Sequence, residues 1–363
     1  MTTRRILMVA GEASADRHAA YVVRAVRQIM PGSEIFGMGG PEMAGAGMEC
    51  TFSMGEISVM GFTDVFPKLL RILKVQNGLK RLMDERRPDI FIPVDLPDFN
   101  MRLAGHAKSR GLPVLYYIAP QAWAWRTYRA RTLARITDGM AVIFPFEEQF
   151  FKTYGVNARY VGHPFLEETD LSRIASWPPK RIGIMPGSRR HEIEKILPVM
   201  LASKRRIEER HPDLSWHLPV APGIDEEFIK PRVDGNVRLE RGLPEVDLAM
   251  VKSGTSSLEM ALLGIPEVIC YKTSALNYTL AKAFIKIKNI GMPNIIARKT
   301  IVPELIQHDL TPEDLARTIL LYVEERSLFE AAQRAFNELK QSLGDMKASE
   351  NMAAWSQEIM ERT

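Results

Sequence analysis

Two loops in the second half of the chain carry side chains that suit an anionic ligand. The first, PGSR (186–189), follows an apolar run at 182–185, and apolar residues recur at helical spacing beyond it. A tight connection from a strand to a helix presents backbone N–H groups and the positive end of the helix dipole. Gly187 lets a ligand approach the backbone, Ser188 can donate a hydroxyl, and Arg189 can hydrogen-bond a phosphate twice. The loop suits half of a diphosphate site, and an ordinary solvated connection is the alternative.

The second loop, KSGTSS (252–257), lies between a strand-like run at 246–251 and a helical run at 258–263. Its glycine and small hydroxyl residues again suit an anion at the amino end of a helix. Glu259, one turn into that helix, can reach a ribose diol or interact only with the helix dipole. No G-x-x-x-x-G-K-[ST] motif occurs, so neither loop is a P-loop. The predicted ligands here are Gly254, Thr255 and Ser256.

The composition is that of a globular chain, with 46% hydrophobic and 25% charged residues. Its 363 residues predict two domains. A net charge of +4 is too small to indicate nucleic-acid binding, and no basic-aromatic RNA motif occurs. The two cysteines, Cys50 and Cys270, are far apart and in apolar settings, which indicates buried thiols in a reducing compartment.

The amino-terminal apolar run is only five residues long, and Glu12 and Asp16 follow it closely. We interpret it as a first strand and not as a signal peptide. No stretch of about 18 apolar residues occurs, so we expect no membrane span. The protein is expected to be soluble or bound to a membrane surface.

Strand and helix patterns alternate along the chain, which predicts an α/β fold with parallel sheets. In the first half the predicted strands are 6–10, 34–37, 90–94, 114–117, 140–144 and 159–161, and the helices are 19–30, 102–110 and 147–154. In the second half the strands are 181–185, 214–220, 246–251 and 267–271, and the helices are 191–210 and 256–263. Residues 311–363 are predicted to be helical, starting from an N-cap at Thr311.

A break at residues 162–179, which ends in Trp177-Pro-Pro, marks the predicted domain boundary. We expect domains at 1–170 and 171–340, with a helical tail at 341–363 that packs on the first domain or on a second subunit. Two facing halves of this type place a ligand cleft at the carboxyl ends of their strands.

Residues 60–81 combine large apolar side chains with a set of basic ones. An apolar face with a basic rim suits a helix that lies in a lipid headgroup layer. A core helix with a solvated basic face is the alternative. The basic residues are Lys68, Arg71, Lys74, Lys80 and Arg81.

The chain resembles the lipid A disaccharide synthase family, bacterial glycosyltransferases that join two acylated glucosamine units. The matching motifs are VAGEAS (9–14) with Asp16, MGF (60–62), VDLPDFN (94–100), IAPQAWAWR (118–126), VGHP (161–164), MPGSR (185–189), SGT (253–255) with Leu258 and Glu259, and MPNIIA (292–297). They occur in the family's order up to about residue 310, so the resemblance covers nearly the whole chain.

The resemblance implies a GT-B fold, with two Rossmann-like domains and UDP held mainly by the second. It implies transfer of 2,3-diacylglucosamine from UDP to the 6-hydroxyl of 2,3-diacylglucosamine 1-phosphate, which releases UDP and forms a β-1,6 disaccharide. The reaction is expected at the inner face of the cytoplasmic membrane, and a homodimer through the helical tail is compatible with the family.

The sequence departs from the family pattern in the predicted acceptor domain. Ala15 stands where the family usually has glycine, and Arg17 and His18 stand where small apolar residues are usual. Ala119 and Gln121 replace serines. These changes affect the expected acceptor contacts more than the donor chemistry.

An inverting transfer needs a base for the acceptor hydroxyl and groups that stabilise the departing diphosphate. The resemblance favours Asp98 as the base; Asp95 is its competitor, spacing alone does not decide, and a helix-capping role for Asp98 is the alternative. Glu12 and Asp16 follow the first strand and can bind sugar hydroxyls or support the base, although Asp16 can also cap the first helix.

On the donor side, Ser188, Arg189 and residues 254–256 would hold the diphosphate, and Glu259 the ribose. Asn294 is carried over from the family as a residue near the donor. The chain has no D-x-D pair, so we predict no metal and no other cofactor.

Three aromatic residues of the motifs are predicted to be structural: His163, Trp123 and Trp125. A UDP-sugar epimerase shares the donor loops and is the nearest rival function. A catalytically silent nucleotide-sugar or lipid-binding protein is the rival from another class.

Overall fold

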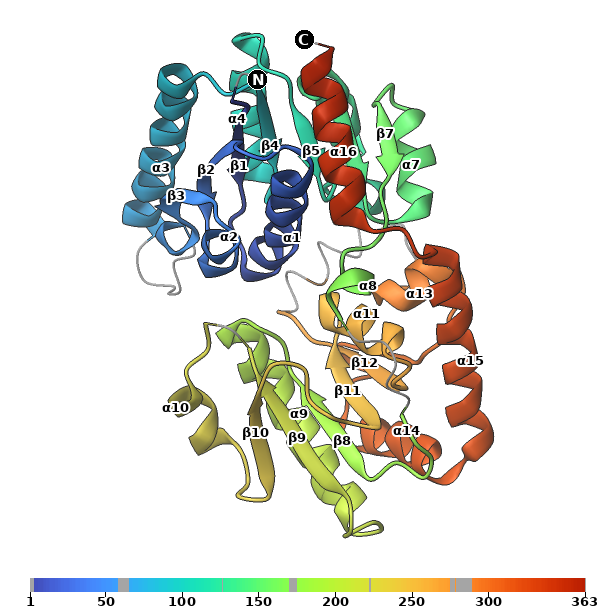
Figure 1. The fold of residues 1–363 in the computed structure, drawn as a ribbon. Coiled ribbons are helices and arrows are strands. Elements are labelled where there is room, and N and C mark those ends of the chain that lie inside the picture. Colours follow the sequence, from blue (N-terminus) through green and yellow to red (C-terminus); the bar gives the residue numbers. More distant parts are fainter. Residues whose placement is uncertain are drawn as a thin grey trace. The chain divides into compact units, whose positions relative to one another are not determined.

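The computed structural model describes residues 3–57, 65–125, 127–169, 175–221, 223–274, 278 and 289–362. The chain divides into two compact units (Figure 1). The N-terminal unit comprises Met1–Thr169 and Leu343–Thr363, and the C-terminal unit comprises Asp170–Ser342. Each unit is an α/β body with its own parallel sheet.

The sheet of the N-terminal unit has the strand order of a Rossmann fold. Four parallel strands lie in the order β3-β2-β1-β4, and two single bridges, Phe91 with Val114 and Val94 with Tyr117, continue it to β5-β6-β7. The strands are β1 (Arg5–Val9), β2 (Glu34–Gly39), β3 (Glu49–Ser53), β4 (Ile90–Pro93), β5 (Leu115–Tyr117), β6 (Gly139–Val142) and β7 (Ala158–Tyr160). From β1 the sheet grows through β2 to β3 on one side and from β4 onward on the other, so the strand order reverses between β1 and β4. Ligands of such sheets bind beside the point of reversal.

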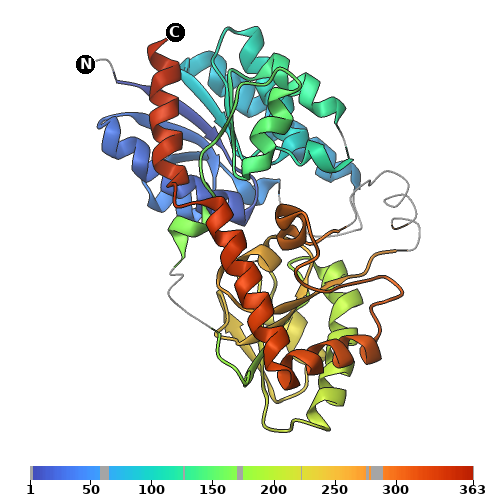
Figure 2. The same cartoon turned by 90° about the vertical axis from the view of Figure 1, so that its right-hand side faces the viewer.

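Helices cover both faces of this sheet because its buried strands alternate their side chains between the two faces. Leu7 and Val9 pack toward α3 and α4 in one apolar core. On the other face of the sheet, α16 packs along α1. In Figure 2, α16 is red and α1 is blue. The helices are α1 (Ala13–Ile29), α2 (Pro41–Gly45), α3 (Val65–Arg86), α4 (Pro97–Ser109), α5 (Ala122–Trp125), α6 (Tyr128–Ile136), α7 (Pro145–Lys152), α8 (Phe165–Glu168) and α16 (Ala348–Glu361).

The C-terminal unit repeats the plan with six parallel strands in the order β10-β9-β8-β11-β12-β13. They are β8 (Arg181–Met185), β9 (Ser215–Val220), β10 (Val237–Arg241), β11 (Leu248–Lys252), β12 (Glu267–Tyr271) and β13 (Glu304–Ile306). Here the order reverses between β8 and β11. The helices are α9 (Arg190–Glu208), α10 (Glu226–Ile229), α11 (Thr255–Leu262), α13 (Met292–Ala297), α14 (Pro312–Glu324) and α15 (Arg326–Leu343).

The alternating pattern predicted the parallel α/β fold correctly, and β8 and β12 have their predicted bounds. Two helices begin earlier than predicted. Helix α1 starts at Ala13, not residue 19, because short residues without apolar periodicity form its first turn. Helix α4 starts at Pro97, not residue 102, because proline fits the first turn of a helix. Strands β3, β10 and β13 were not predicted, since edge strands carry polar residues among few apolar ones.

Candidate functional site

The two predicted anion loops lie on the neighbouring strands β8 and β11, on either side of the reversal in strand order. Gly187, in the first loop, has φ +115, and a Cβ there would lie 2.6 Å from Glu192 Oε2. Only glycine therefore fits the backbone at this point. Ser188 and Arg189 are exposed, and the side chain of Arg189, the N-cap residue of α9, makes no cap hydrogen bond there. The loop presents its backbone and both side chains at the sheet end where nucleotides bind in such folds.

The second loop leads from β11 into α11. The buried Ser257 hydroxyl donates to Gly254 O over 2.9 Å and so fixes the turn. Thr255 is exposed, and Ser256 and Glu259 are half-buried in the first turns of α11. Small hydroxyl side chains thus lie at a second helix amino end, next to the first loop in the sheet.

A lysine that sequence reasoning did not select connects the two loops. Lys252, the last residue of β11, places Nζ 3.0 Å from Glu192 Oε1, and the two side chains are only 19% and 12% exposed. Arg189 Nη1 lies 3.9 Å from the same carboxylate oxygen. Two cations therefore share one buried anion between the loops. The only sign in the sequence that Lys252 belongs to the site was its position as the first residue of the KSGTSS loop. No spacing rule linked Lys252 to Glu192.

Asn294, predicted near the donor, is fully buried. Its Nδ2 donates to Val302 O over 2.9 Å and to Glu304 Oε1 over 2.7 Å. Its Oδ1 accepts from the N–H groups of Ile301, 2.7 Å away, and Val302, 3.0 Å away. All four hydrogen-bonding positions of the amide are occupied within the C-terminal unit. Asn294 therefore fixes α13 to the segment that enters β13.

In the N-terminal unit, carboxyl groups gather where β1 and β4 end. Glu12 lies at the N-cap of α1, and Asp95 follows β4 with φ +48, a left-handed conformation that is rare outside glycine. The Asp95 carbonyl accepts from Tyr116 Oη over 2.7 Å and Asn100 Nδ2 over 2.9 Å, which fixes this turn. Burial, and then the charge of Glu12, raise the pKa of Asp95 to about 6. The two carboxyl groups are thus electrostatically coupled.

Asp98 lies in the first turn of α4 and forms an ion pair with Arg129 of α6. The Asp98 side chain is 79% exposed, whereas that of Arg129 is 10% exposed. The guanidinium is therefore held by the protein and the carboxylate is presented at the surface. Arg129 was not among the residues selected from the sequence.

Asp16 has a structural position. It is 1% exposed, and its carboxylate accepts from the N–H groups of Gly40 (2.8 Å), Glu42 (3.0 Å) and Met43 (3.1 Å). These groups form the amino end of α2, so Asp16 caps α2. The alternative from the sequence was that Asp16 caps the first helix, α1, to which it belongs.

The aromatic motif residues pack within the N-terminal unit. His163 is buried, its Nδ1 accepts from Phe165 N over 3.3 Å, and burial lowers its pKa to about 3. Trp123 Nε1 donates to Glu147 Oε1 over 2.9 Å. These contacts agree with structural roles; the Trp125 side chain lies outside the described residues.

Part of the predicted membrane stretch, residues 60–64, also lies outside the described residues. Within α3, Leu70 is 55% exposed. No described helix is long and apolar enough to cross a membrane. Among the described residues, no cluster of His, Cys, Asp or Glu could hold a metal ion.

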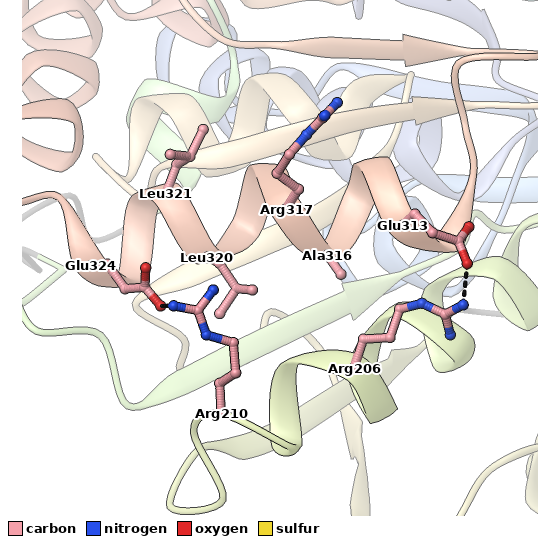
Figure 3. Close-up of a pocket in the computed structure, with 8 residues that line it drawn as sticks. All are labelled: Arg206, Arg210, Glu313, Ala316, Arg317, Leu320, Leu321 and Glu324. Carbon is pink, nitrogen blue, oxygen red and sulfur yellow. Dashed lines mark hydrogen bonds and ion pairs between the residues drawn. The ribbon is translucent and has the colours of Figure 1, made fainter.

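A shallow groove of about 330 Å³ lies between the end of α9 and α14, at the opposite end of α9 from the loops (Figure 3). Arg206 pairs with Glu313, and Arg210 pairs with Glu324 over 2.9 Å. The third arginine of the groove, Arg317, pairs with Asp314. Because each of these arginines has a carboxylate partner, we assign the groove no part in the site.

A family model described as lipid-A-disaccharide synthetase matches residues 6–359. A lipid-A-disaccharide synthase from Anaeromyxobacter dehalogenans (strain 2CP-C) is 42% identical over 360 residues, which cover 94% of each chain. A protein of the same name from Syntrophus aciditrophicus (strain SB) is 38% identical over 381 residues, with 100% of both covered. The match therefore spans both units.

Solved structures show the same fold at low identity. A putative UDP-N-acetylglucosamine 2-epimerase from Listeria monocytogenes has a TM-score of 0.66 at 13% identity, with 100% of this chain and 98% of that chain covered. MurG from Acinetobacter baumannii has a TM-score of 0.55 at 16% identity, with 98% and 99% covered. The fold is GT-B.

Proposed function

The chain belongs to the lipid-A-disaccharide synthase family, and from that membership we propose that its C-terminal unit binds the UDP-linked donor and its N-terminal unit the lipid acceptor. It is a UDP-sugar-dependent glycosyltransferase of lipid A biosynthesis. In the proposed reaction 2,3-diacylglucosamine moves from UDP to the 6-hydroxyl of 2,3-diacylglucosamine 1-phosphate, and UDP leaves. An epimerase has only a likeness of fold to this chain, whereas the synthase family matches its full length.

The observation that carries the donor assignment is the adjacency of the two loops on β8 and β11. The diphosphate is bound by the amino ends of α9 and α11, by the Ser188 hydroxyl and by Arg189. Gly254, Thr255 and Ser256 contribute from the second loop, and Glu259 binds the ribose. As the glycosidic bond to UDP breaks, these donors stabilise the growing negative charge.

On the acceptor side, Asp98 takes the proton of the 6-hydroxyl as the general base, oriented by Arg129. Glu12 and Asp95, which are electrostatically coupled where β1 and β4 end, bind sugar hydroxyls. Asp16 and Asn294 act through other groups: the first orders α2 beside the acceptor end of β1, and the second orders α13 beside the donor loops.

We place the enzyme at the inner face of the cytoplasmic membrane as a peripheral protein, because both proposed substrates are lipids. On α3, Leu70, Lys74 and Arg81 are exposed and share one helical face, which supports membrane contact there. A homodimer stays a prediction, since α16 of the tail packs on α1 of its own chain.

The test is UDP release and disaccharide formation by the purified protein, with both lipids in detergent and EDTA present. Activity that persists in EDTA and falls by about a hundredfold or more in both Asp98→Ala and Arg189→Ala supports the two roles and a metal-free mechanism. UDP release without acceptor would instead support an epimerase. UDP binding with no turnover of either lipid would support a silent binding protein.

A further inference from the structure

The Glu192 carboxylate lies in the middle of the proposed donor site. It belongs to the first turn of α9, and Lys252 at the end of β11 and Arg189 at the N-cap of α9 both contact its Oε1, at 3.0 Å and 3.9 Å. Burial, and then the charge of Glu192, raise the pKa of the Tyr271 phenol at the end of β12. One anion therefore engages cations from both loops.

The same carboxylate lies against the backbone of the first loop. A Cβ on Gly187 would fall 2.6 Å from Glu192 Oε2 and 3.2 Å from Glu192 Cβ. The glycine thus leaves room for an acidic side chain that belongs to the protein, in addition to any ligand. The Glu192 carboxylate therefore lies close to the loop that is proposed to bind the diphosphate, and both groups are negatively charged.

We propose that Glu192 is an internal counter-ion that competes with the donor's diphosphate for Lys252 and Arg189, and that Lys252 is a donor-binding residue. This inference rests on the proposed donor site. Without nucleotide, Glu192 keeps the two cations near the loop and neutralised. When UDP-sugar binds, the diphosphate becomes the main partner of Lys252, and the Glu192 carboxylate repels the diphosphate at close range. After transfer, Glu192 again attracts the cations, which favours UDP release.

The two variants that separate this idea from a purely structural salt bridge have opposite expected effects. Glu192→Gln keeps the side-chain volume and removes the competing charge, so UDP should bind about fivefold more tightly and dissociate more slowly. Lys252→Met keeps the apolar stem and removes the cation, so UDP should bind about tenfold more weakly. Lys252→Arg should restore most of the affinity.

Matched controls come from the same helix. Glu194 and Lys195 are exposed neighbours on α9, and Glu194→Gln and Lys195→Met make the same changes of charge at solvent-exposed positions. Both should leave the dissociation constant of UDP within about twofold of that of the wild type. Calorimetry gives the dissociation constant, stopped-flow displacement gives the dissociation rate, and thermal unfolding shows that each variant is folded.

A folded Glu192→Gln variant that binds UDP as weakly as Lys252→Met would overturn the inference, because Glu192 would then position Lys252 and not compete for it. Unchanged affinity in Lys252→Met would overturn it as well. Failure of the proposed function is a separate result: the wild type would not bind UDP, or Arg189→Ala would bind it normally. Tighter binding in Glu192→Gln with slower UDP dissociation supports the competition.

Discussion

Arg129 of α6 forms an ion pair with Asp98 of α4, and it is the buried member of the pair. The exposed carboxylate therefore takes its orientation from a guanidinium that the protein holds in place. This contact joins a residue of the VDLPDFN motif (94–100) to one that lies outside the motifs of the resemblance, and it makes Arg129 a positioning residue for the proposed base.

Replacing Arg129 by methionine should lower kcat by about ten- to a hundredfold, because a misplaced base loses that much rate. The dissociation constant of UDP should not change, since Arg129 lies in the N-terminal unit. Arg129→Lys should recover part of kcat, and Arg131→Met, on an exposed position of α6, serves as the control. Steady-state kinetics with both lipids checks this, and an unchanged kcat would remove Arg129 from the mechanism.

The activity should fall in acid with a midpoint near the pKa of Asp95, about 6. Burial and the neighbouring Glu12 charge favour the protonated form, whereas the Leu96 N–H and His18 oppose it. Asp95 is thus ionised above pH 6 and becomes protonated as the pH falls through it. Glu12→Gln removes a repelling charge, so the acid limb of kcat/KM should move to lower pH. Profiles from pH 5 to 8.5 check this, and identical limbs in Glu12→Gln, Asp95→Asn and the wild type would contradict it.

The sequence predicted both strand-to-helix loops because a strand, a break with glycine and a helical run are local signals. It did not predict which loop residues meet. Lys252 and Glu192 lie in different βα units, and only the order of β8 and β11 in the sheet brings them to 3.0 Å. Single-sequence patterns carry no information on such pairs.

The same limit applies to buried polar residues. Asp16 was predicted to bind sugar hydroxyls because it follows the first strand, and Asn294 was carried over from the family resemblance as a residue near the donor. Their occupied hydrogen-bonding positions depend on α2 and on residues 301–304, which are distant in sequence. Local pattern alone could not distinguish a ligand from a residue that orders the backbone.

Asn294→Asp should destabilise the protein by about 3 kcal/mol, because the change removes two donors and puts a second carboxylate beside Glu304. Asn236→Asp, at an exposed position, should change stability by less than about 1 kcal/mol. Urea unfolding measures both. Wild-type stability together with weakened UDP binding would instead mark Asn294 as a direct ligand.

The exposed face of α3 should contribute to membrane binding. Leu70→Glu and Lys74→Glu should each reduce binding to vesicles that contain anionic phosphatidylglycerol, by about fivefold or more, through lost apolar contact and lost charge attraction. Leu321→Glu is the control, since Leu321 is 45% exposed on α14 in the other unit. Vesicle flotation checks this. Equal losses in the α3 and control variants would contradict a specific role for α3.

Glu267 should make the protein less stable as the pH rises. It is fully buried at the start of β12, its carboxyl oxygens have no hydrogen-bond partner among the described residues, and burial, then the charge of Glu304, raise its pKa well above 4.5. The folded state therefore holds a proton that the unfolded chain releases above pH 4.5. From there up to the folded pKa, this group lowers the free energy of unfolding by about 1.4 kcal/mol per pH unit.

Glu267→Gln should abolish that dependence, since the amide does not titrate, and the variant's advantage over the wild type should grow between pH 5 and pH 8. Glu194→Gln, on an exposed position, should leave the wild-type dependence unchanged. Urea unfolding at several pH values measures the slope. If the difference between Glu267→Gln and the wild type stays constant across this range, the carboxyl group is ionised in the folded protein, and residues around β12 must then supply a partner for its charge.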